Sequence, residues 1–338
     1  MGDKVIGYTA MSRSEELVPR VYDAPVLKAD EVRVAVTHCG ICGSDLQAVD
    51  DTYQVFDFPF VPGHEVVGII REVGDGVPVS RLGERVGVGW QARACGKCEL
   101  CRQGLPQLCL EVVDNGTWTP IGGFSSAIVA QSRFVYPLPA DMADETAAVL
   151  LCAGLSVYSA LSRHSAALEP WLGVVGIGGL GHLALQFGKA LGYEVTAISS
   201  SAAKREEALA FGASRFLDMG EKGAFKPFND YLNLVLITAH GGFDWDRILG
   251  VMKRRGKIIL AAFPKVTLDP VDLVVHELSI AGTFVVTPDE MREMLAFAQA
   301  HHIRPMVEVM PLSRVNEAVR RVRENKARYR VVLVNDLG

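Results

Sequence analysis

The sequence predicts an α/β protein of two domains, a β-rich domain at the N-terminus followed by a doubly wound parallel sheet. Short runs of alternating polar and apolar residues, separated by glycines, fill the first 150 residues, which is typical of an antiparallel, barrel-like β domain. From residue 171 onward strand-like and helix-like segments alternate, which indicates a parallel sheet covered by helices. The length of 338 residues also exceeds what one hydrophobic core usually serves.

Composition excludes several classes of partner. Hydrophobic residues make up 49% of the chain, enough for sizeable cores, and the net charge of −5 argues against a general nucleic-acid surface. The N-terminus has no apolar segment of the signal-peptide kind. No uninterrupted apolar run approaches the roughly 18 residues of a membrane span. We therefore expect a soluble, cytoplasmic protein whose partner is a small molecule, with neither nucleic acid nor membrane involved.

The first domain is expected to hold strands at residues 31–37, 65–73 and 85–88, because these runs alternate polar and apolar residues. The stretch CGICGSD at residues 39–45 is too rich in glycine for a helix interior. It predicts a loop that runs into a short helix and presents Cys42 and Ser44 from its edge.

Cys42, His64 and Cys152 form a three-ligand set of the kind that holds a catalytic zinc and keeps a fourth position open. Glu65, beside His64, would support the ligands or fill the open position at rest. Cys152 lies in a segment, residues 143–161, that should be partly helical. A lone buried cysteine is most often a small core residue, so Cys152 is a ligand candidate only because the first domain supplies two matching ligands.

Ser44 lies two residues beyond the Cys42 thiolate. Its hydroxyl could therefore reach an oxygen at the open position of the metal. The alternative role for Ser44 is to cap a helix N-terminus.

A second cysteine cluster is local: Cys95, Cys98, Cys101 and Cys109 follow the pattern C-x2-C-x2-C-x7-C within 15 residues. Four thiolates close a tetrahedron around zinc and leave no open position, so this site would be structural. The loop has few apolar residues, so metal would supply its order. An iron–sulfur cluster is the alternative, and exposed free thiols are disfavoured. Seven cysteines in a reducing compartment are better explained as ligands than as disulfides, with Cys39 left over.

The segment after residue 170 contains a dinucleotide-binding pattern. An apolar strand at residues 171–175 leads into GIGGLG, a helix at 182–190 and a second strand at 194–198. This is the strand, glycine turn, helix and strand order that the G-x-G-x-x-G fingerprint requires. The backbone N–H groups of the turn would bind a pyrophosphate at the helix N-terminus. The residues of this turn are Gly176, Gly178, Gly179, Leu180 and Gly181.

The residues at the end of the second strand determine whether NAD or NADP is preferred. NAD-binding units commonly place Asp or Glu there, whereas this strand runs into Ser199, Ser200 and Ser201, followed by Lys204. Hydroxyls and a cation suit a 2′-phosphate, so the sequence predicts NADP(H). The alternative is that Ser201 caps the next helix and Lys204 is solvated on its surface.

The remaining segments complete the sheet and define the domain boundaries. Strands are expected at 234–237, 257–262 and 279–283, helices at 290–300 and 313–325, and a last strand at 330–335 that returns to the first domain. The predicted domains are 1–152 with 291–338, and 153–290.

Together these motifs resemble the zinc-containing medium-chain dehydrogenase/reductase superfamily over essentially the whole chain. The similarity is greatest to the cinnamyl alcohol dehydrogenase subgroup, through VPGHEVVG, the four-cysteine loop, GGFS, LLCAG, ISSS with the following KREEAL, and ARYR near the C-terminus. The resemblance implies a GroES-like catalytic domain joined to a Rossmann domain, two zinc ions per chain, and NADP(H)-dependent interconversion of primary alcohols and aldehydes. It also implies a homodimer formed through the Rossmann sheets.

The family's functional residues fall on matching positions of this chain. The resemblance implies that Cys42, His64 and Cys152 are the catalytic zinc ligands and that Glu65 is the exchangeable carboxylate. It places the relay hydroxyl on Ser44. The contacts to the 2′-phosphate fall on Ser200 and Lys204.

The chain departs from the subgroup where relatives often read CGICHTDLH and this sequence reads CGICGSDLQ. Gly43 replaces a side chain that can approach the coenzyme phosphates. Gln47 replaces a histidine that ends the proton relay in many relatives, and an amide does not titrate near neutral pH. Asp45, Asp50 or water are the remaining candidates for the outer relay, and a weaker pH dependence of turnover is expected.

Trp90, Trp118 and Leu150 are candidates for an apolar substrate pocket that would suit an aromatic or medium aliphatic aldehyde. Trp118 falls where the subgroup has a pocket tryptophan, and ordinary core packing is the alternative for these residues. Two other functions stay open: a zinc-dependent polyol or secondary-alcohol dehydrogenase, and an NADPH-binding protein without turnover.

Overall fold

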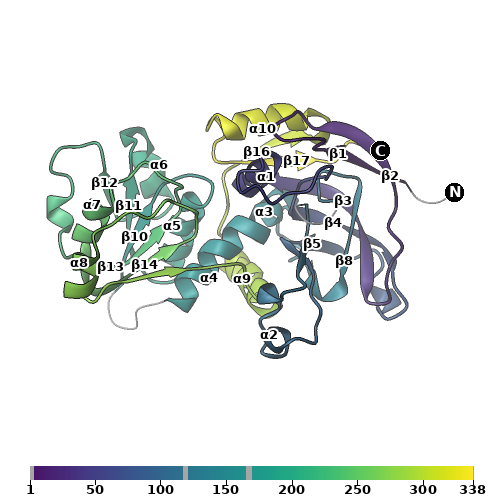
Figure 1. Ribbon diagram of the computed structural model, residues 1–338, viewed down its shortest axis with the longest axis horizontal. Helices are drawn as coiled ribbons and strands as arrows, with labels where there is room; N and C mark the ends of the chain where they lie inside the picture. Colours follow the sequence, from purple (N-terminus) through teal and green to yellow (C-terminus); the bar gives the residue numbers. More distant parts are fainter. Residues whose placement is uncertain (1–3, 117–120, 165–169, 338) are drawn as a thin grey trace. The chain divides into compact units, whose positions relative to one another are not determined.

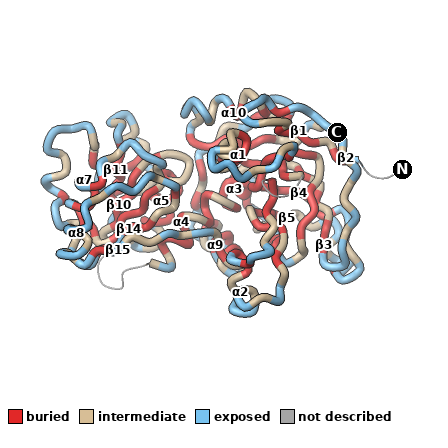
Figure 2. The backbone as a smooth tube through the Cα atoms, in the orientation of Figure 1, coloured by how far each residue is buried: buried red, intermediate tan, exposed pale blue. Residues whose placement is uncertain are grey.

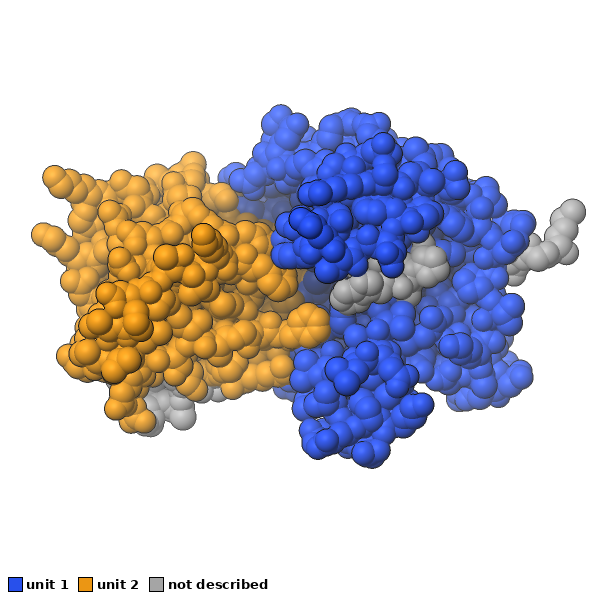
Figure 3. Space-filling view, viewed as in Figure 1, with its two compact units in different colours: residues 1–152, 285–299, 304–338 blue, residues 153–284, 300–303 orange. Residues whose placement is uncertain are grey.

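The computed structural model describes residues 4–116, 121–164 and 170–337. The chain divides into two compact units, each a separate body in the colouring of Figure 3. The first unit comprises residues 1–152, 285–299 and 304–338, and the second comprises 153–284 and 300–303. The predicted boundaries were at residues 152 and 290. The structure instead places residues 285–290 in the first unit and residues 300–303 in the second.

The first unit is built on a seven-stranded sheet of order β16-β17-β3-β4-β5-β9, with β8 also pairing with β3. Its ladders are antiparallel except for the parallel pair β16 and β17. The strands are β3 (Glu31–Ile41), β4 (Glu65–Val73), β5 (Arg85–Val88), β8 (Ala127–Gln131), β9 (Val135–Pro137), β16 (Val307–Pro311) and β17 (Arg330–Val334). The predicted β-rich domain is therefore confirmed.

Smaller elements surround this sheet (Figure 1). Two short sheets pair β1 (Lys4–Thr9) with β2 (Val18–Asp23), and β6 (Gln91–Arg93) with β7 (Val113–Asp114). The α-helices of this unit are α1 (Gly43–Val49), α2 (Glu99–Arg102), α3 (Asp144–Val149), α9 (Pro288–Ala300) and α10 (Val315–Arg323). Single 3₁₀ turns lie at Val79–Arg81, Pro106–Leu108, Ser132–Phe134 and Leu312–Arg314.

The core of the first unit follows from the alternation in β3. Val32, Val34 and Val36 are buried and face the core, because side chains two apart on a strand share one face. They join apolar residues of β4, β5, β8 and β17 in one cluster, and Figure 2 shows the corresponding backbone as buried. At about 25 cal/mol per Å² of apolar surface, each fully buried valine stabilises the fold by roughly 1.5 kcal/mol or more.

The last strand returns to the first unit, as predicted. β17 pairs antiparallel with β3, and its register places Val331 opposite Ile41 and Leu333 opposite Cys39. β4 pairs antiparallel with the other side of β3. The end of β3 therefore lies between the beginnings of β4 and β17.

The second unit is a six-stranded parallel sheet of order β12-β11-β10-β13-β14-β15. Numbered within this unit, the order is 3-2-1-4-5-6, that of a doubly wound Rossmann sheet, so the predicted fold class is confirmed. The strands are β10 (Trp171–Val175), β11 (Glu194–Ser199), β12 (Arg215–Asp218), β13 (Leu232–Ile237), β14 (Met252–Leu260) and β15 (Ser279–Gly282). The α-helices are α4 (Leu155–Arg163), α5 (Gly181–Ala190), α6 (Arg205–Ala210), α7 (Trp245–Gly250) and α8 (Pro270–Val275), with 3₁₀ turns at Ala202–Lys204 and Lys226–Phe228.

The central strands of the second unit are nearly continuous apolar runs. In β10, Leu172, Val174 and Val175 are all fully buried, and β13 is buried in the same way. Such runs are typical of parallel strands that helices cover on both faces. The nucleotide crevice of this fold lies where the strand order reverses, between β10 and β13.

The helical run Asp144–Arg163 is long and apolar enough to cross a bilayer by length and composition alone. Because 78% of its most apolar window is buried within the protein, we interpret it as a core helix. It consists of α3, a π-helical turn at Leu150–Gly154, and α4. The sequence predicted helix here but not the π-turn.

Candidate active site

The four residues of the predicted catalytic site come together at the ends of central strands of the first unit's sheet. Cys42 follows the end of β3, and His64 and Glu65 stand at the start of β4. Arg330, which is not one of the four, opens β17. The register pairs Gly40 with Glu65 on one side and with Val332 on the other. Neighbouring antiparallel strands thus deliver side chains that are far apart in the sequence.

The ligand atoms of Cys42, His64, Glu65 and Cys152 all lie within 4.8 Å of one another. The two sulfurs of Cys42 and Cys152 are 3.9 Å apart. Two thiolates at about 2.3 Å from a tetrahedral zinc would be about 3.8 Å apart. The residues present therefore fit a zinc ion held by two sulfurs and a ring nitrogen.

Cys152 reaches this cluster from the π-helical turn Leu150–Gly154. The preceding helix α3 packs against β3, β4 and β17, so the turn emerges next to the ends of those strands. A π-turn widens one turn of a helix and is frequent at functional sites. Here it coincides with the residue that completes the cluster.

Asp45 holds His64, a role that the sequence analysis missed. Its Oδ1 accepts hydrogen bonds from His64 Nδ1 at 2.9 Å and from the Gly63 N–H at 3.1 Å, and its Oδ2 accepts from the Cys42 N–H at 2.8 Å. Both side chains are 1% exposed. This arrangement fixes the tautomer that leaves Nε2 for a metal. Asp45 therefore orients His64 and, being buried, is not placed to pass protons to solvent. The CGICGSDL motif contains Asp45, but the contact to His64 can be seen only in the folded structure.

The charges around His64 also set its pKa. Burial lowers the pKa of His64, but the neighbouring carboxylate of Asp45 and the thiolate of Cys42 outweigh burial and raise it well above its usual range. The hydrogen bond from Cys152 and the proximity of His64 hold the pKa of Cys42 well below its usual range, whereas the same sulfur contact and burial raise the pKa of Cys152. Two thiolates this close together repel each other, and a shared metal cation would stabilise both.

Glu65 is held by Arg330, the second residue that the sequence analysis missed as a functional residue. Arg330 Nη2 donates to Glu65 Oε1 and, at 3.0 Å, to the carbonyl oxygen of Ile41. Burial raises the pKa of Glu65 to about 7, although the positive charge of Arg330 lowers it. Arg330 is the last residue of the ARYR motif, but that motif alone does not show that its partner lies 265 positions away.

The second carboxylate oxygen of Glu65 has no hydrogen-bond partner. Oε2 is buried, and no described residue forms a hydrogen bond with it. A Cβ added at Gly40 would lie 2.0 Å from this oxygen, so glycine is needed there to make room for the carboxylate. Such an orphaned oxygen suits a carboxylate that can bind the metal at rest.

Ser44, the predicted relay hydroxyl, lies beside the Cys42 sulfur. Its Oγ is 3.1 Å from Cys42 Sγ. The N-cap of α1 is Cys42 and not Ser44, so the capping alternative for Ser44 is wrong. Asp50, another relay candidate, pairs with Arg323 at 2.7 Å.

The four-cysteine loop also gathers its sulfurs. Cys95, Cys98, Cys101 and Cys109 have all four Sγ atoms within 4.8 Å of one another, with distances of 3.5 Å from Cys95 to Cys109 and 3.9 Å from Cys98 to Cys109. Backbone N–H groups point at these sulfurs over 3.3–3.4 Å. Its only apolar support among the described residues is a small cluster around Phe134. Four thiolates with no fifth donor fit a closed structural zinc.

The thiols of this loop differ in their affinity for protons. Hydrogen bonds from the backbone N–H groups of Lys97 and Cys98 lower the pKa of Cys95 to about 6. Burial and the neighbouring sulfurs raise the pKa of Cys101 to about 12. Four adjacent sulfurs without a cation cannot all be thiolates, which agrees with a metal as their common partner.

Two of the three predicted pocket residues, Trp90 and Leu150, lie among the described residues. Trp90 is half-buried, and its backbone carbonyl accepts the Asn115 N–H at 2.8 Å. Leu150 is fully buried, so the suggestion that it lines an open pocket is wrong: it packs in the core. Trp118 lies outside the described residues.

The glycine turn of the second unit has the geometry of a pyrophosphate cradle. Gly176 has a φ of +92°, and a Cβ there would lie 2.6 Å from Ala239 Cβ. A Cβ at Gly181 would lie 2.0 Å from the Gly176 carbonyl oxygen, so this glycine allows α5 to approach the strand. A Cβ at Gly178 would meet nothing within 4 Å. That open space is where a phosphate could approach the backbone, so the residues fit a dinucleotide.

Gly179 and Leu180 complete the turn, and Leu180 is the N-cap residue of α5. Thr238, just beyond β13, holds the turn from the neighbouring strand. Its hydroxyl lies 2.6 Å from the Gly176 carbonyl oxygen and 3.0 Å from that of Val175. The sequence analysis did not consider Thr238, because no local pattern links it to the turn.

The serines after β11 differ in what they can offer a ligand. Ser199 is 3% exposed, and its Oγ accepts the Ser201 N–H at 3.2 Å, so this hydroxyl stabilises its own turn. Ser200 is exposed and Ser201 is half-buried. Lys204 Nζ donates to the Ile177 carbonyl at 2.6 Å, which places the cation beside the glycine turn. Ser201 precedes the 3₁₀ turn at Ala202–Lys204 without a capping hydrogen bond from its side chain.

A buried site of two thiolates and an imidazole, carried on the same chain as a doubly wound sheet with a dinucleotide turn, defines a zinc-binding dehydrogenase. Family models agree: the alcohol dehydrogenase GroES-like domain matches residues 28–140, and the zinc-binding dehydrogenase model matches residues 179–300. The chain belongs to the zinc-containing alcohol dehydrogenase family, with similarity to its cinnamyl alcohol dehydrogenase members.

Relatives of known name show how far this similarity extends. An aldehyde reductase of Synechocystis sp. is 35% identical over 331 residues, which cover 96% of this chain and 97% of the relative. An NADP-dependent alcohol dehydrogenase of Mycolicibacterium smegmatis is 33% identical over 97% of both chains. The solved cinnamyl alcohol dehydrogenase of Sorghum bicolor superposes with a TM-score of 0.92, at 34% identity, over 98% of both chains.

Proposed function

We propose that this chain is an NADP(H)-dependent alcohol dehydrogenase and aldehyde reductase that interconverts primary aromatic or medium aliphatic alcohols and their aldehydes. The observation that carries this proposal is the convergence of Cys42, His64 and Cys152 at 4.8 Å or less, with the Glu65 carboxylate beside them. Three protein ligands leave a fourth position at which a small oxygen ligand can bind. The related aldehyde reductase and alcohol dehydrogenases support the same reaction class.

Each residue around the site has a defined task in this proposal. When bound, zinc polarises the substrate oxygen and NADPH supplies the hydride. Ser44 would relay a proton: it passes one to that oxygen as an aldehyde is reduced and takes one up from water, and the reverse occurs when an alcohol is oxidised. Its Oγ lies 3.1 Å from the Cys42 sulfur. Asp45 keeps His64 in the ligating tautomer.

Glu65 and Arg330 control the charge of the site. The two thiolates and the Glu65 carboxylate are negative, and the buried guanidinium of Arg330 is the nearby positive group of the protein. Arg330 therefore holds one oxygen of Glu65, and the other, Oε2, has no hydrogen-bond partner among the described residues and would be the one to bind the metal at rest.

The coenzyme preference is proposed from the end of β11. Ser200 and Ser201 offer hydroxyls, and Lys204 brings a cation to the glycine turn. Asp218 lies opposite Ser199 on β12, but its Oδ1 accepts the Gly220 N–H at 2.9 Å and so caps its own turn. We therefore expect the 2′-phosphate to be favoured, as the name of the NADP-dependent relative supports.

A cytoplasmic homodimer belongs to the same proposal. All seven cysteines are free thiols, as a reducing compartment would keep them. β15 is an edge strand of the second unit's sheet, and unpaired edges invite pairing with another chain. Large apolar side chains are exposed nearby in the sequence, at Phe263, Val271, Val274, Val275 and Phe284. Native mass spectrometry should show a dimer, and a monomer at micromolar concentration would contradict this part.

The experiment that tests the function measures metal content and coenzyme oxidation together. We expect two zinc ions per chain, and NADPH oxidation with benzaldehyde-type or aliphatic aldehydes at least tenfold faster than with NADH. Faster turnover of polyols or secondary alcohols would instead identify the related dehydrogenase activity. Full turnover after exhaustive removal of zinc, or NADPH binding with no turnover on any of these substrates, would overturn the proposal.

A further inference from the structure

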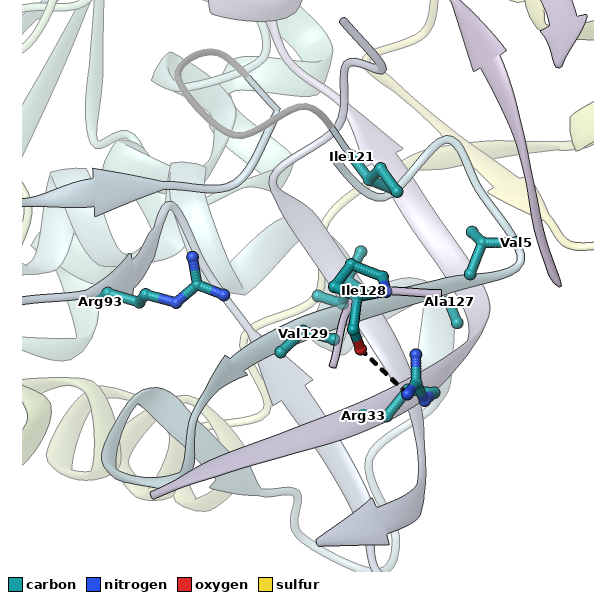
Figure 4. A pocket seen from close by; sticks show the side chains of 8 residues that line it. Val5, Arg33, Arg93, Ile121, Ala127, Ile128 and Val129 are labelled. Atoms are coloured by element: carbon teal, nitrogen blue, oxygen red, sulfur yellow. Dashed lines mark hydrogen bonds between the residues drawn. The ribbon is translucent and has the colours of Figure 1, made fainter. Parts of the chain in front are cut away.

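The two arginines that line a small cavity of the first unit are already paired. Figure 4 shows Arg33 and Arg93 beside apolar side chains, and its dashed line is the hydrogen bond from Arg33 to the Pro25 carbonyl oxygen. Arg33 also pairs with Glu72, and Arg93 pairs with Glu31. The polar side chains that still lack a task lie in the second unit, around the glycine turn.

Two side chains from other segments hold the first two carbonyl groups of this turn. Thr238, just beyond β13, has one hydroxyl proton, and its shortest contact, at 2.6 Å, is to the Gly176 carbonyl oxygen. Lys204 Nζ donates to the Ile177 carbonyl oxygen at 2.6 Å. Both side chains belong to half-buried residues, so each contact is partly shielded from solvent.

His182, in the first turn of α5, holds the third carbonyl group. Its Nδ1 lies 2.9 Å from the Gly178 carbonyl oxygen, which can only accept, so Nδ1 carries a proton in this contact. The residue is fully buried, and its ring meets Phe211 edge to face with the centroids 5.5 Å apart. This packing fixes the orientation of the imidazole.

The held carbonyl groups determine where the N–H groups that follow them point. In a trans peptide, the C=O of one residue and the N–H of the next lie in one plane and point in opposite directions. The three contacts therefore orient the N–H groups of Ile177, Gly178 and Gly179. None of these three N–H groups has a hydrogen-bond partner among the described residues, and a Cβ at Gly178 would meet nothing within 4 Å. Adjacent unpaired backbone donors of this kind suit a phosphate.

We propose that Thr238, Lys204 and His182 form a clamp that sets the affinity for the coenzyme pyrophosphate by orienting the backbone donors of the turn. The three are positioning residues, because they act on the pyrophosphate through the peptide groups they hold. Without them the peptide groups can rotate and must be ordered at each binding event, which weakens binding. The clamp rests on the proposed NADP(H) function, and it gives Lys204 a second task besides the 2′-phosphate.

Variants of similar size remove each donor. Thr238→Val, His182→Leu and Lys204→Met should each raise the Kd of NADPH by about tenfold, because an ordered donor to a charged group is lost. Thr238→Ser keeps the hydroxyl, and His182→Asn returns an amide N–H near the place of Nδ1, so both should stay within about threefold of the parent. The Kd is measured by fluorescence titration of the full-length, zinc-loaded protein.

Two further ligands separate the clamp from a general loss of structure. NADH has the pyrophosphate without the 2′-phosphate, and its Kd should rise about tenfold in all three donor-deleting variants, Lys204→Met included. Adenosine 2′-phosphate lacks the pyrophosphate, and its Kd, from ligand-observed NMR, should stay within about twofold in Thr238→Val and His182→Leu. Thr196→Val, which alters a buried threonine of β11, is the matched control and should leave all three Kd values unchanged within about twofold.

Several outcomes would overturn the clamp. Thr238→Val and His182→Leu would bind NADPH as tightly as the parent, or would weaken adenosine 2′-phosphate and NADPH equally, which would mean that they only distort the unit. An unchanged NADH Kd in Lys204→Met would restrict Lys204 to the 2′-phosphate and remove it from the clamp. A parent chain that binds neither dinucleotide would instead refute the proposed function.

A crystal structure of the unaltered chain with NADPH gives a test that needs no variant. We expect the contacts of Thr238 and His182 to the turn to persist, with the N–H groups of residues 177–179 directed at the pyrophosphate oxygens. If these carbonyl groups were rotated away from Thr238 and His182 while the pyrophosphate was bound, the clamp would be wrong.

Discussion

The two cysteine-containing clusters of this chain are built in opposite ways. Cys95, Cys98, Cys101 and Cys109 lie within one loop, supported by backbone N–H groups and a very small apolar cluster. Cys42 and Cys152 are 110 positions apart, and the sheet brings them and His64 together. A local cluster thus relies on its metal for order, whereas an assembled cluster is pre-formed by the fold that carries it.

Their surroundings differ in charge as well. Around the assembled cluster, Asp45 and Arg330 are both nearly fully buried, and each contacts a residue that faces the cluster. The cysteine loop has no buried charged side chain of this kind among the described residues that support it. Pre-organisation by buried partners is what an active centre needs, while a closed metal site needs only its four sulfurs.

The largest effect is expected from Cys152→Ser. A hydroxyl replaces one of the two sulfurs, and zinc should be lost or misplaced. Because metal polarisation contributes several kcal/mol to such reactions, kcat should fall by about 10³-fold or more. NADPH binding, followed by fluorescence titration, should stay within about twofold, because the coenzyme turn belongs to the other unit.

The matched control for this variant is Cys39→Ser. Cys39 is buried in the same unit, and its Sγ lies 3.6 Å from the Gly40 carbonyl rather than in the cluster. Its turnover should remain within about threefold of the parent. If Cys152→Ser kept a tenth or more of the parent kcat, Cys152 would not be a required ligand and the assembled site would need another third donor.

The next largest effect is expected from Arg330→Met, measured on the metal-stripped protein. Removing one partner of a buried ion pair costs about 3–5 kcal/mol, because Glu65 stays buried without its counter-charge. Arg328→Met, an exposed arginine two residues away, is the control and should cost less than about 0.5 kcal/mol. Urea unfolding of both variants would give these values.

The loss in Arg330→Met should depend on pH in a defined direction. Burial raises the pKa of Glu65 to about 7 in the folded chain, above the value of about 4.3 in an unfolded one. A raised carboxyl pKa gives stability that is fully present below the unfolded pKa and is lost as pH rises through the folded pKa. Without Arg330, which lowers this pKa, the decline should continue to higher pH. The variant should therefore lose more stability at pH 8 than at pH 5, and adding Glu65→Gln should restore it. Equal losses at both pH values would contradict the role of Glu65.

The same contrast explains what the sequence could predict. The strands β4, β5 and β10 begin and end at the expected residues, because their alternation or apolar character is a local property. The glycine turn and the cysteine loop are also local patterns. The ligands of the assembled cluster could be named from their residue types and the family resemblance, but not from spacing alone.

Other features of the site could not be predicted, because each depends on a long-range contact. The hydrogen bond of Asp45 to His64 requires the first turn of α1, which follows β3, to lie next to the start of β4. The pairing of Arg330 with Glu65 requires β17 and β4 to flank β3. Leu150 was a candidate for a pocket wall, but its full burial in the core depends on packing that the sequence does not show.

A smaller effect is expected from Asp45→Asn. The amide can still accept the hydrogen bond from His64 Nδ1, but it carries no charge and cannot accept on both sides. Loss of such a supporting partner typically lowers metal affinity or activity by about 10- to 100-fold. Zinc affinity would be measured by competition with a chelator. The control is Asp50→Asn, which disturbs only a partly exposed ion pair and should leave the zinc affinity unchanged within about twofold. If both variants lowered the zinc affinity equally, the loss of one negative charge would explain the effect, and the contact to His64 would not.

The smallest effect on turnover is expected from Cys101→Ser in the cysteine loop. Metal content should fall from two ions to one, and the loop should become a substrate for limited proteolysis at residues 95–112, because little else holds it in place. At 25 °C the kcat should change by less than about threefold, since supporting loops act on stability more than on chemistry. Glu99→Gln, an exposed change in the same loop, should alter neither the metal count nor the cleavage rate. A loss of turnover as large as that of Cys152→Ser would mean that the two clusters are coupled, and the distinction between a local and an assembled site would not hold for this protein.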